Sequence, residues 1–300
     1  MYARVYGSLD RGVIEYGEVA QMRVAVVQLN PRIGDAASNL AEIERGAEEA
    51  AEAGAQLAVF PECAVNGYMY QSLEEGLGAA EPIPGAHSRA LQEIAREHKV
   101  HLVAGLLERD RGTLFNAALL ASPDGSISLY RKTHTLCLGV DRFTTPGDIP
   151  YAVHELPFGR VGILICYDLR FPEASRALAL AGVQIIALPT NWPVSSTTMP
   201  DVFTRSRAAE NRVFVLAADR VGTERGAMFL GRSQVVAPGG QVLEEAGEES
   251  AEVLVADLEL QRADRKHVIL APGEHEMDVF RDRRPELYAS LSERGESVVA

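Results

Sequence analysis

Short apolar runs alternate along the chain with longer stretches in which apolar residues return at helical spacing. The run RVAVVQLNP (23–31) is almost continuously apolar until its Asn-Pro end, which predicts a buried strand followed by a loop. Between residues 35 and 54, apolar positions recur every three or four residues until a final glycine, which predicts a helix. QLAVFPE (56–62) then predicts a second buried strand.

The same alternation continues for about two hundred residues. Pro123-Asp124-Gly125 predicts a hairpin turn, because proline presets its φ and glycine accepts a positive one. Gly159 marks a second turn within a paired unit at 151–166. The pattern further predicts helices at 88–99, 172–181 and 203–211, and strands at 101–106, 114–121, 126–131, 184–190, 212–218, 233–237, 241–244 and 252–257.

These elements predict one α/β domain in which antiparallel hairpins are mixed with βαβ units. Strands buried on both faces need a layer on each side, so we expect helices outside and sheets inside. We place the domain at 22–288, with a C-terminal tail at 289–300. Residues 1–21 lack a basic start followed by an apolar run, so we interpret them as an N-terminal extension rather than a secretory signal.

Composition and charge narrow the class of protein. The chain has 300 residues, 47% of them hydrophobic and 24% charged, which is typical of a globular protein. Its 29 Lys and Arg against 42 Asp and Glu give a net charge of −13, which disfavours nucleic acid and anionic membranes as partners. No apolar run approaches the roughly 20 residues that span a bilayer. Three cysteines without paired spacing favour a reducing, cytoplasmic location.

Several common catalytic motifs are missing from the sequence. It contains no phosphate-binding G-x-x-x-x-G-K-[ST], no G-x-S-x-G, no H-E-x-x-H and no G-x-G-x-x-G after a strand. His98 and His101 have helical spacing but no carboxylate or cysteine at metal-ligand spacing, so we expect no metal site there.

Three residues that could do chemistry occur where predicted buried strands end. Glu62 follows LAVFP, Lys132 follows the strand that ends at Arg131, and Cys166 follows VGILI. Ligands in α/β sheets bind at the carboxyl ends of strands, so these side chains could converge. Taken singly, each also fits a structural role: a helix-start acid, a solvated lysine and a buried small residue. We assign the structural role to the other two cysteines, Cys63 and Cys137.

The chain resembles the carbon-nitrogen hydrolases of the nitrilase superfamily in a series of ordered segments. They are VFPECAVNGY (59–68), YRKTH (130–134), FTTPGD (143–148), GILICYDLRFPE (162–173), LPTNWP (188–193), RAAENRVFV (207–215), GRSQVVAPGG (231–240) and RRPELY (283–288). The resemblance implies a four-layer αββα sandwich and a Glu-Lys-Cys catalytic set at Glu62, Lys132 and Cys166. It also implies homodimers or larger homo-oligomers that pair through a helical face, and no metal or organic cofactor.

The residue types suit cleavage of an amide. A free thiol is only slightly ionised at neutral pH, so Glu62 is expected to take the proton of Cys166 as the thiol attacks the carbonyl. Lys132 and the backbone N–H of Tyr167 are the expected oxyanion donors. Glu62 then returns the proton to the leaving ammonia, and water hydrolyses the resulting thioester.

One segment departs from the family pattern. Members generally carry a second glutamate between the lysine and the cysteine, whereas the nearest acid here is Asp141, which is shorter and differently spaced. Asp141 either fills that role through a shifted loop or leaves it vacant.

Three further residues are candidates to line the pocket: Asn191 and Trp192, at another strand end, and Tyr68. An Arg207–Glu210 pair at i,i+3 is expected to be structural.

CYDLRFPE resembles the amidase side of the family, which includes omega-amidases, because true nitrilases usually follow the cysteine with Trp-Glu. We therefore expect hydrolysis of a small linear carboxamide, with N-carbamoyl hydrolysis second and nitrile hydrolysis third. Two readings of other kinds stay open. One is a catalytically idle binding module, and the other is a Cys-His-Asp hydrolase that uses His134 or His154.

Overall fold

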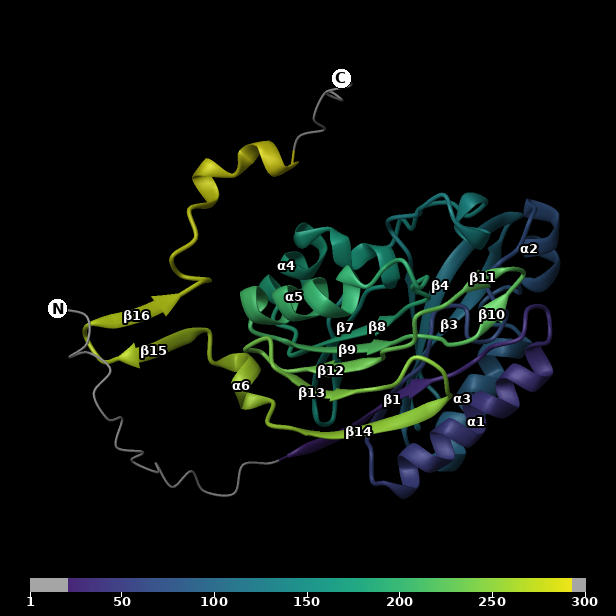
Figure 1. Cartoon of the computed structure of the whole chain (residues 1–300), viewed down its shortest axis with the longest axis horizontal. Helices are drawn as coiled ribbons and strands as arrows, with labels where there is room; N and C mark the ends of the chain where they lie inside the picture. Colours follow the sequence, from purple (N-terminus) through teal and green to yellow (C-terminus); the bar gives the residue numbers. More distant parts are fainter. Residues whose placement is uncertain (1–20, 293–300) are drawn as a thin grey trace.

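A computed structural model describes residues 21–292, in which two six-stranded sheets lie face to face (Figure 1). The predicted extension at 1–21 lies almost wholly outside the described residues, as does most of the tail. The first sheet has the order β14-β1-β2-β3-β4-β5. Its strands are β1 (Met22–Gln28), β2 (Leu57–Val59), β3 (His101–Asp110), β4 (Thr113–Ala121), β5 (Ile127–Arg131) and β14 (Glu252–Leu258).

The second sheet has the order β13-β12-β9-β8-β7-β6. Its three central strands run parallel and the outer ones antiparallel. Its strands are β6 (His154–Leu156), β7 (Gly159–Ile163), β8 (Ile185–Pro189), β9 (Phe214–Ala218), β12 (Gln234–Val236) and β13 (Val242–Glu245).

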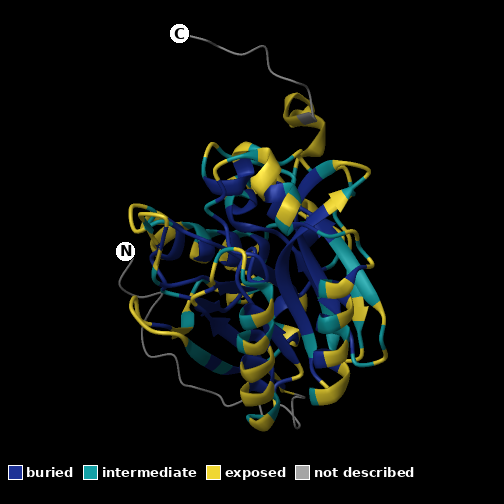
Figure 2. Ribbon diagram, turned by 90° about the vertical axis from the view of Figure 1, so that its right-hand side faces the viewer, coloured by how far each residue is buried: buried dark blue, intermediate teal, exposed yellow. Residues whose placement is uncertain are grey.

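Helices cover the outer face of each sheet. On the first sheet these are α1 (Ala36–Glu52) and α3 (Ala86–His98), and on the second they are α4 (Pro172–Leu180) and α5 (Thr204–Asn211). Figure 2 shows buried strands between helices whose outward faces are exposed. The four-layer αββα sandwich expected from the resemblance is therefore confirmed.

The alternation of side chains in β1 explains the two apolar layers on its faces. Val24 and Val26 face the core between the sheets, whereas Ala25 and Val27 pack into the layer under α1 and α3. Every one of these side chains is buried, which is why the sequence shows a continuous apolar run instead of an alternating one.

Strand direction places the predicted site residues at shared edges. β2 and β3 are parallel, and β4 is antiparallel to both β3 and β5. β5 is therefore parallel to β2, so the residues that follow these two strands emerge at the same edge of the first sheet. Cys166 follows β7, in the facing sheet.

The C-terminal part of the described chain leaves the sandwich. After α6 (Gln261–Asp264), the hairpin of β15 (His267–Ala271) and β16 (His275–Asp278) projects away from the two sheets (Figure 1). The sequence pattern did not predict this hairpin. Three short elements were also not predicted: α2 (Leu73–Ala79), β10 (Thr223–Glu224) and β11 (Ala227–Met228).

None of the helices within 21–292 has the length and apolar character that a membrane span requires.

Candidate active site

Glu62 stands in a tight turn that follows β2. This turn lies so close to β3 that a Cβ atom on Gly105 would be 2.3 Å from the Cys63 nitrogen and 2.6 Å from the Glu62 Cα. The Gly105 N–H donates to the Pro61 carbonyl oxygen at 3.0 Å. The absence of a side chain at Gly105 therefore lets β3 hold the turn, and with it the fully buried Glu62 carboxylate.

Lys132 follows β5 and reaches the Glu62 carboxylate. Its ammonium Nζ donates to Glu62 Oε1 at 2.7 Å and to Asp141 Oδ2 at 2.5 Å. All three side chains are fully buried. The structure thus brings together two strand-end residues predicted from sequence, and it places the shifted Asp141 directly against the lysine.

Asn116 in the middle of β4 joins this cluster, and sequence reasoning missed it. Its Nδ2 donates to Glu62 Oε1 at 2.6 Å and to Asp141 Oδ1 at 2.8 Å. Its backbone carbonyl accepts from the Lys132 N–H at 2.8 Å. The signal in the sequence was a single polar residue inside the apolar run LFNAALLA (114–121). A buried polar group needs hydrogen-bond partners, so this asparagine indicated a polar contact in the core.

Cys166 begins a 3₁₀ turn, Cys166–Arg170, just beyond β7. Its φ of +46° lies in the left-handed region, which is strained for a residue other than glycine. The residue as a whole is 6% exposed, and it lines a cavity. Such strain is a known feature of turns that aim a functional side chain.

Asp168 ties the turn of Cys166 to the segment that carries Lys132. Its fully buried carboxylate accepts from the Ile165 N–H at 2.9 Å, on the cysteine side. On the lysine side it accepts from the hydroxyls of Tyr130 at 2.8 Å and Thr133 at 3.0 Å. His134 adds its backbone N–H at 2.9 Å. One carboxylate therefore fixes the two segments relative to each other.

The protonation states follow from burial and charge. Burial raises the pKa of the Cys166 thiol, the Glu62 charge raises it further, and Lys132 lowers it. Burial also raises the pKa of Glu62, against the opposing effect of Lys132. Burial lowers the pKa of Lys132, but the charges of Asp141 and Glu62 outweigh burial and hold it well above its ordinary value. The arrangement at neutral pH is a protonated thiol, an ammonium and a carboxyl group with raised proton affinity.

The cavity in front of Cys166 has a volume of about 250 Å³ and mostly apolar walls. Arg170 is the one charged side chain among those that line it within residues 21–292. Four candidates from the sequence line it as well, namely Tyr68, Tyr167, Asn191 and Trp192; the remaining lining residues are Leu136, Leu138, Pro193, Ser196 and Met199.

The side-chain amide of Asn191 binds the protein backbone, which is not the contact expected of a residue that binds substrate. Its Nδ2 donates to the backbone carbonyl of Glu62 at 2.8 Å, so it ties the end of β8 to the Glu62 turn. Trp192 is held by Asp219, whose Oδ1 accepts from the Trp192 N–H at 2.9 Å. Sequence reasoning did not identify Asp219.

A buried ion pair supports the Tyr68 wall of the cavity. Glu224 Oε2 accepts from the backbone N–H groups of Tyr68 at 2.8 Å and Met69 at 2.6 Å. Its other oxygen accepts from Arg220 Nη1 at 2.7 Å.

The ion pair between Arg207 and Glu210, which the i,i+3 spacing predicted, also forms. Arg207 Nη1 lies 2.9 Å from Glu210 Oε1.

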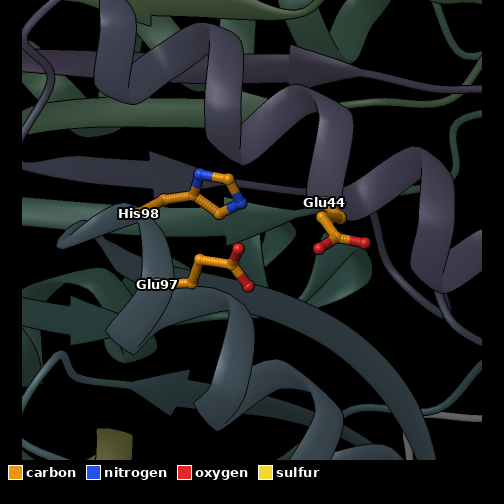
Figure 3. Close-up of side chains that lie close together, drawn as sticks. All are labelled: Glu44, Glu97 and His98. Carbon is orange, nitrogen blue, oxygen red and sulfur yellow. The ribbon is translucent and has the colours of Figure 1, made fainter.

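Two other features lie away from this cluster. A larger cavity of about 600 Å³ between α4 and the C-terminal segment contains none of the sequence-predicted site residues. On the outer helices, Glu44, Glu97 and His98 lie close together (Figure 3). Both of these carboxylates are exposed, and such surface groupings are common without an ion, so we assign them no role.

Comparisons with known proteins identify the family of the chain. The profile of the carbon-nitrogen hydrolase family matches residues 23–267. A nitrilase of Pyrococcus abyssi is 40% identical over 270 residues, covering 89% of this chain and 99% of the relative. An omega-amidase of Homo sapiens is 34% identical over 255 residues, covering 80% and 87%. A solved amidase variant from Nesterenkonia sp. AN1, with acrylamide added to its active-site cysteine, superimposes with a TM-score of 0.78 at 31% identity, covering 90% and 99%.

Proposed function

The chain belongs to the carbon-nitrogen hydrolase family, and we propose that it hydrolyses a small linear carboxamide to a carboxylate and ammonia through a thioester on Cys166. It is an enzyme of the nitrilase superfamily. One observation carries the finer proposal: Lys132 bridges two buried carboxylates, and the charges of Lys132 and Glu62 act on Cys166, which opens to a small, largely apolar cavity.

In the first half-reaction the Cys166 sulfur attacks the amide carbon while Glu62 accepts the thiol proton. The Lys132 ammonium and the Tyr167 N–H stabilise the oxyanion of the tetrahedral intermediate. Glu62 then gives its proton to the departing nitrogen, so that ammonia leaves and the acyl group stays on sulfur.

In the second half-reaction water attacks the thioester. Glu62 takes a proton from that water, the carbon–sulfur bond breaks, and the proton returns to the sulfur. Asp141 acts through Lys132: its carboxylate raises the pKa of the lysine and fixes the position of the ammonium. On this proposal Asp141 takes the role of the second glutamate that family members generally carry.

Arg170 favours a substrate with an anionic end. It is the one charged residue on the cavity wall within residues 21–292, and its guanidinium lies 5.1 Å from the centre of the Phe203 ring. A guanidinium can bind a carboxylate through two hydrogen bonds. We therefore propose an omega-amide of a short dicarboxylic acid as the preferred carboxamide, which is also the class that the name of the human relative indicates.

The test offers the protein an omega-amide acid, a neutral amide of equal length, an N-carbamoyl amino acid and a nitrile. Ammonia release and intact protein mass are followed together, with Cys166→Ala as the control. Ammonia from the amides and an acyl adduct that Cys166→Ala lacks support the proposal. Turnover of the carbamoyl compound or the nitrile alone moves the assignment to that branch. Silence with every compound while Cys166 still reacts with iodoacetamide favours an idle binding module.

A histidine-dependent mechanism makes the opposite prediction about two variants. His134 Nδ1 lies 2.8 Å from Asp168 Oδ1, but its ring stacks on Phe171 with centroids 3.7 Å apart. Under our proposal Lys132→Ala abolishes turnover and His134→Gln only reduces it. The reverse result assigns the chemistry to the histidine instead.

A further inference from the structure

The two carboxylate oxygens of Glu62 have unequal surroundings. Oε1 accepts from Lys132 Nζ at 2.7 Å and from Asn116 Nδ2 at 2.6 Å. Oε2 is buried, and no protein group within residues 21–292 donates a hydrogen bond to it. A carboxylate oxygen that already accepts two hydrogen bonds, one of them from an ammonium, is the poorer proton acceptor of the pair.

The orientation of the Asn116 amide is fixed on both sides. Its Nδ2 donates to Glu62 and to Asp141, so both of its N–H groups are used. Its Oδ1 accepts from the Cys63 thiol at 3.6 Å. If the side-chain amide were flipped by 180°, its oxygen would face the two carboxylates and be repelled by them. Asn116 therefore presents its N–H groups to the two acids. The hydrogen bond from the Cys63 thiol to Oδ1 stabilises the same orientation.

From this geometry we infer that Asn116 is a positioning residue that, with Lys132, occupies Oε1 of Glu62 and leaves Oε2 as the oxygen that takes and returns the reaction proton. The inference rests on the proposed function, because it specifies how the base of that mechanism works. It identifies a determinant of the reaction on β4, outside the Glu-Lys-Cys set.

Loss of the Asn116 donor changes the acidity of the base. The hydrogen bond from Asn116 lowers the pKa of Glu62, against the larger raising effect of burial. Without it, the protonated and inactive form of Glu62 persists to higher pH. A hydrogen bond to a charged group is worth enough to move a pKa by about one to two units, so the acid limb of the pH profile moves up by that amount.

The principal variant is Asn116→Leu, which keeps the approximate size and removes the donors. We expect the acid limb of kcat/KM to rise by about one to two pH units, with a roughly 10- to 100-fold loss of kcat/KM at neutral pH. The matched control is Gln28→Leu, since Gln28 is equally buried and its amide also uses both N–H groups and its oxygen. The control is expected to lose stability without moving the pH profile.

The same shift is measured without substrate, as the pH dependence of Cys166 alkylation by iodoacetamide. A protein that hydrolyses no amide but shows the shift in Asn116→Leu retains the inference and loses the proposed function. A folded Asn116→Leu whose limb coincides with that of wild type in both assays overturns the inference. If Asn116→Leu does not fold, Asn116→Ala decides, because it removes both donors without adding bulk. An upward shift of the acid limb supports the inference, and no shift overturns it.

Discussion

At the scale of single residues, the site holds two buried carboxylates against one buried ammonium. Lys132 touches both Glu62 and Asp141, and all three side chains are fully buried. Buried charges of one sign cost a great deal of free energy unless they are paired. The lysine that we propose as an oxyanion donor therefore also stabilises the fold.

We expect Lys132→Met to abolish turnover and to lower the free energy of unfolding by about 3–5 kcal/mol, because both carboxylates lose their counter-ion. Chemical denaturation and ammonia release measure the two effects. Adding Asp141→Asn to Lys132→Met removes one uncompensated charge and should restore part of the stability but none of the activity. Equal stability of the single variant and wild type would contradict the argument.

The pH profile follows from the same charges. The pKa of Glu62 is raised, so kcat/KM should fall as the pH drops through a value above the ordinary range of a glutamate. The pKa of Lys132 is raised well above its ordinary value, so deprotonation of this lysine should produce no alkaline limb below about pH 10. Initial rates between pH 4 and 10 with a saturable substrate test both the acid limb and the absence of an alkaline limb. An alkaline limb that disappears in Lys132→Arg would contradict the expectation for the lysine.

Arg170 should separate charged from neutral substrates. We expect Arg170→Gln to raise KM for an omega-amide acid about 10- to 100-fold, because a charge-assisted pair is lost. The KM for a neutral amide of equal length should change little. Because the guanidinium also rests on Phe203, thermal unfolding of the variant is measured alongside. Equal losses for both substrates would place Arg170 in a purely structural role.

At the scale of elements, the position of the Glu62 carboxylate depends on how closely β3 approaches the Glu62 turn. The space beside Gly105 is filled by backbone atoms of Pro61, Glu62 and Cys63, which cannot move aside as a flexible side chain could. The position of Glu62, the proposed base, is thus set by a strand that carries none of the proposed catalytic side chains.

Gly105→Ala should push that turn away from β3. We expect kcat to fall by at least about 100-fold, since misplacement by about 1 Å is enough for such a loss, together with a measurable drop in Tm. Gly78→Ala provides the comparison, since an added Cβ there meets nothing within 4 Å. Retention of full activity by Gly105→Ala would mean that the turn adapts freely.

Apolar runs predicted the sheets well because the central strands, such as β1, β2, β8 and β9, are buried and therefore apolar along most of their length. The places of Glu62, Lys132 and Cys166 just beyond strands were predictable because strand ends are visible in the sequence. The contacts of Asn116 and Asp168 were not, since each depends on which distant segments meet it. The β15–β16 hairpin was missed for a related reason: Ile269 and Leu270 are exposed, so they show no pattern of burial.

At the scale of the whole molecule, the C-terminal segment presents apolar side chains away from the sandwich. Ile269, Leu270, Leu287 and Leu291 are each more than half exposed. Leu180 on α4 is also exposed, and with Leu291 it lines the cavity of about 600 Å³ between α4 and the C-terminal segment. The homo-oligomer expected from the family resemblance would cover such a surface.

We expect the full chain to sediment as a dimer or a larger homo-oligomer, and a double variant, Ile269→Lys with Leu287→Lys, to shift it towards the monomer. Analytical ultracentrifugation at several concentrations measures this. Glu44→Lys on the opposite outer layer is the control for a change of charge alone. A wild-type monomer at all concentrations would contradict the expectation.

The candidate site is divided between the two halves of the sandwich. Glu62, Asn116 and Lys132 come from the first sheet, whereas Cys166 comes from the second, and the halves meet where β2 packs on β8 and β9. During refolding, a chain with either sheet formed alone would hold the proposed base or the proposed nucleophile but not both. Recovery of activity should therefore report the docking of the two sheets, which the formation of either sheet alone does not require.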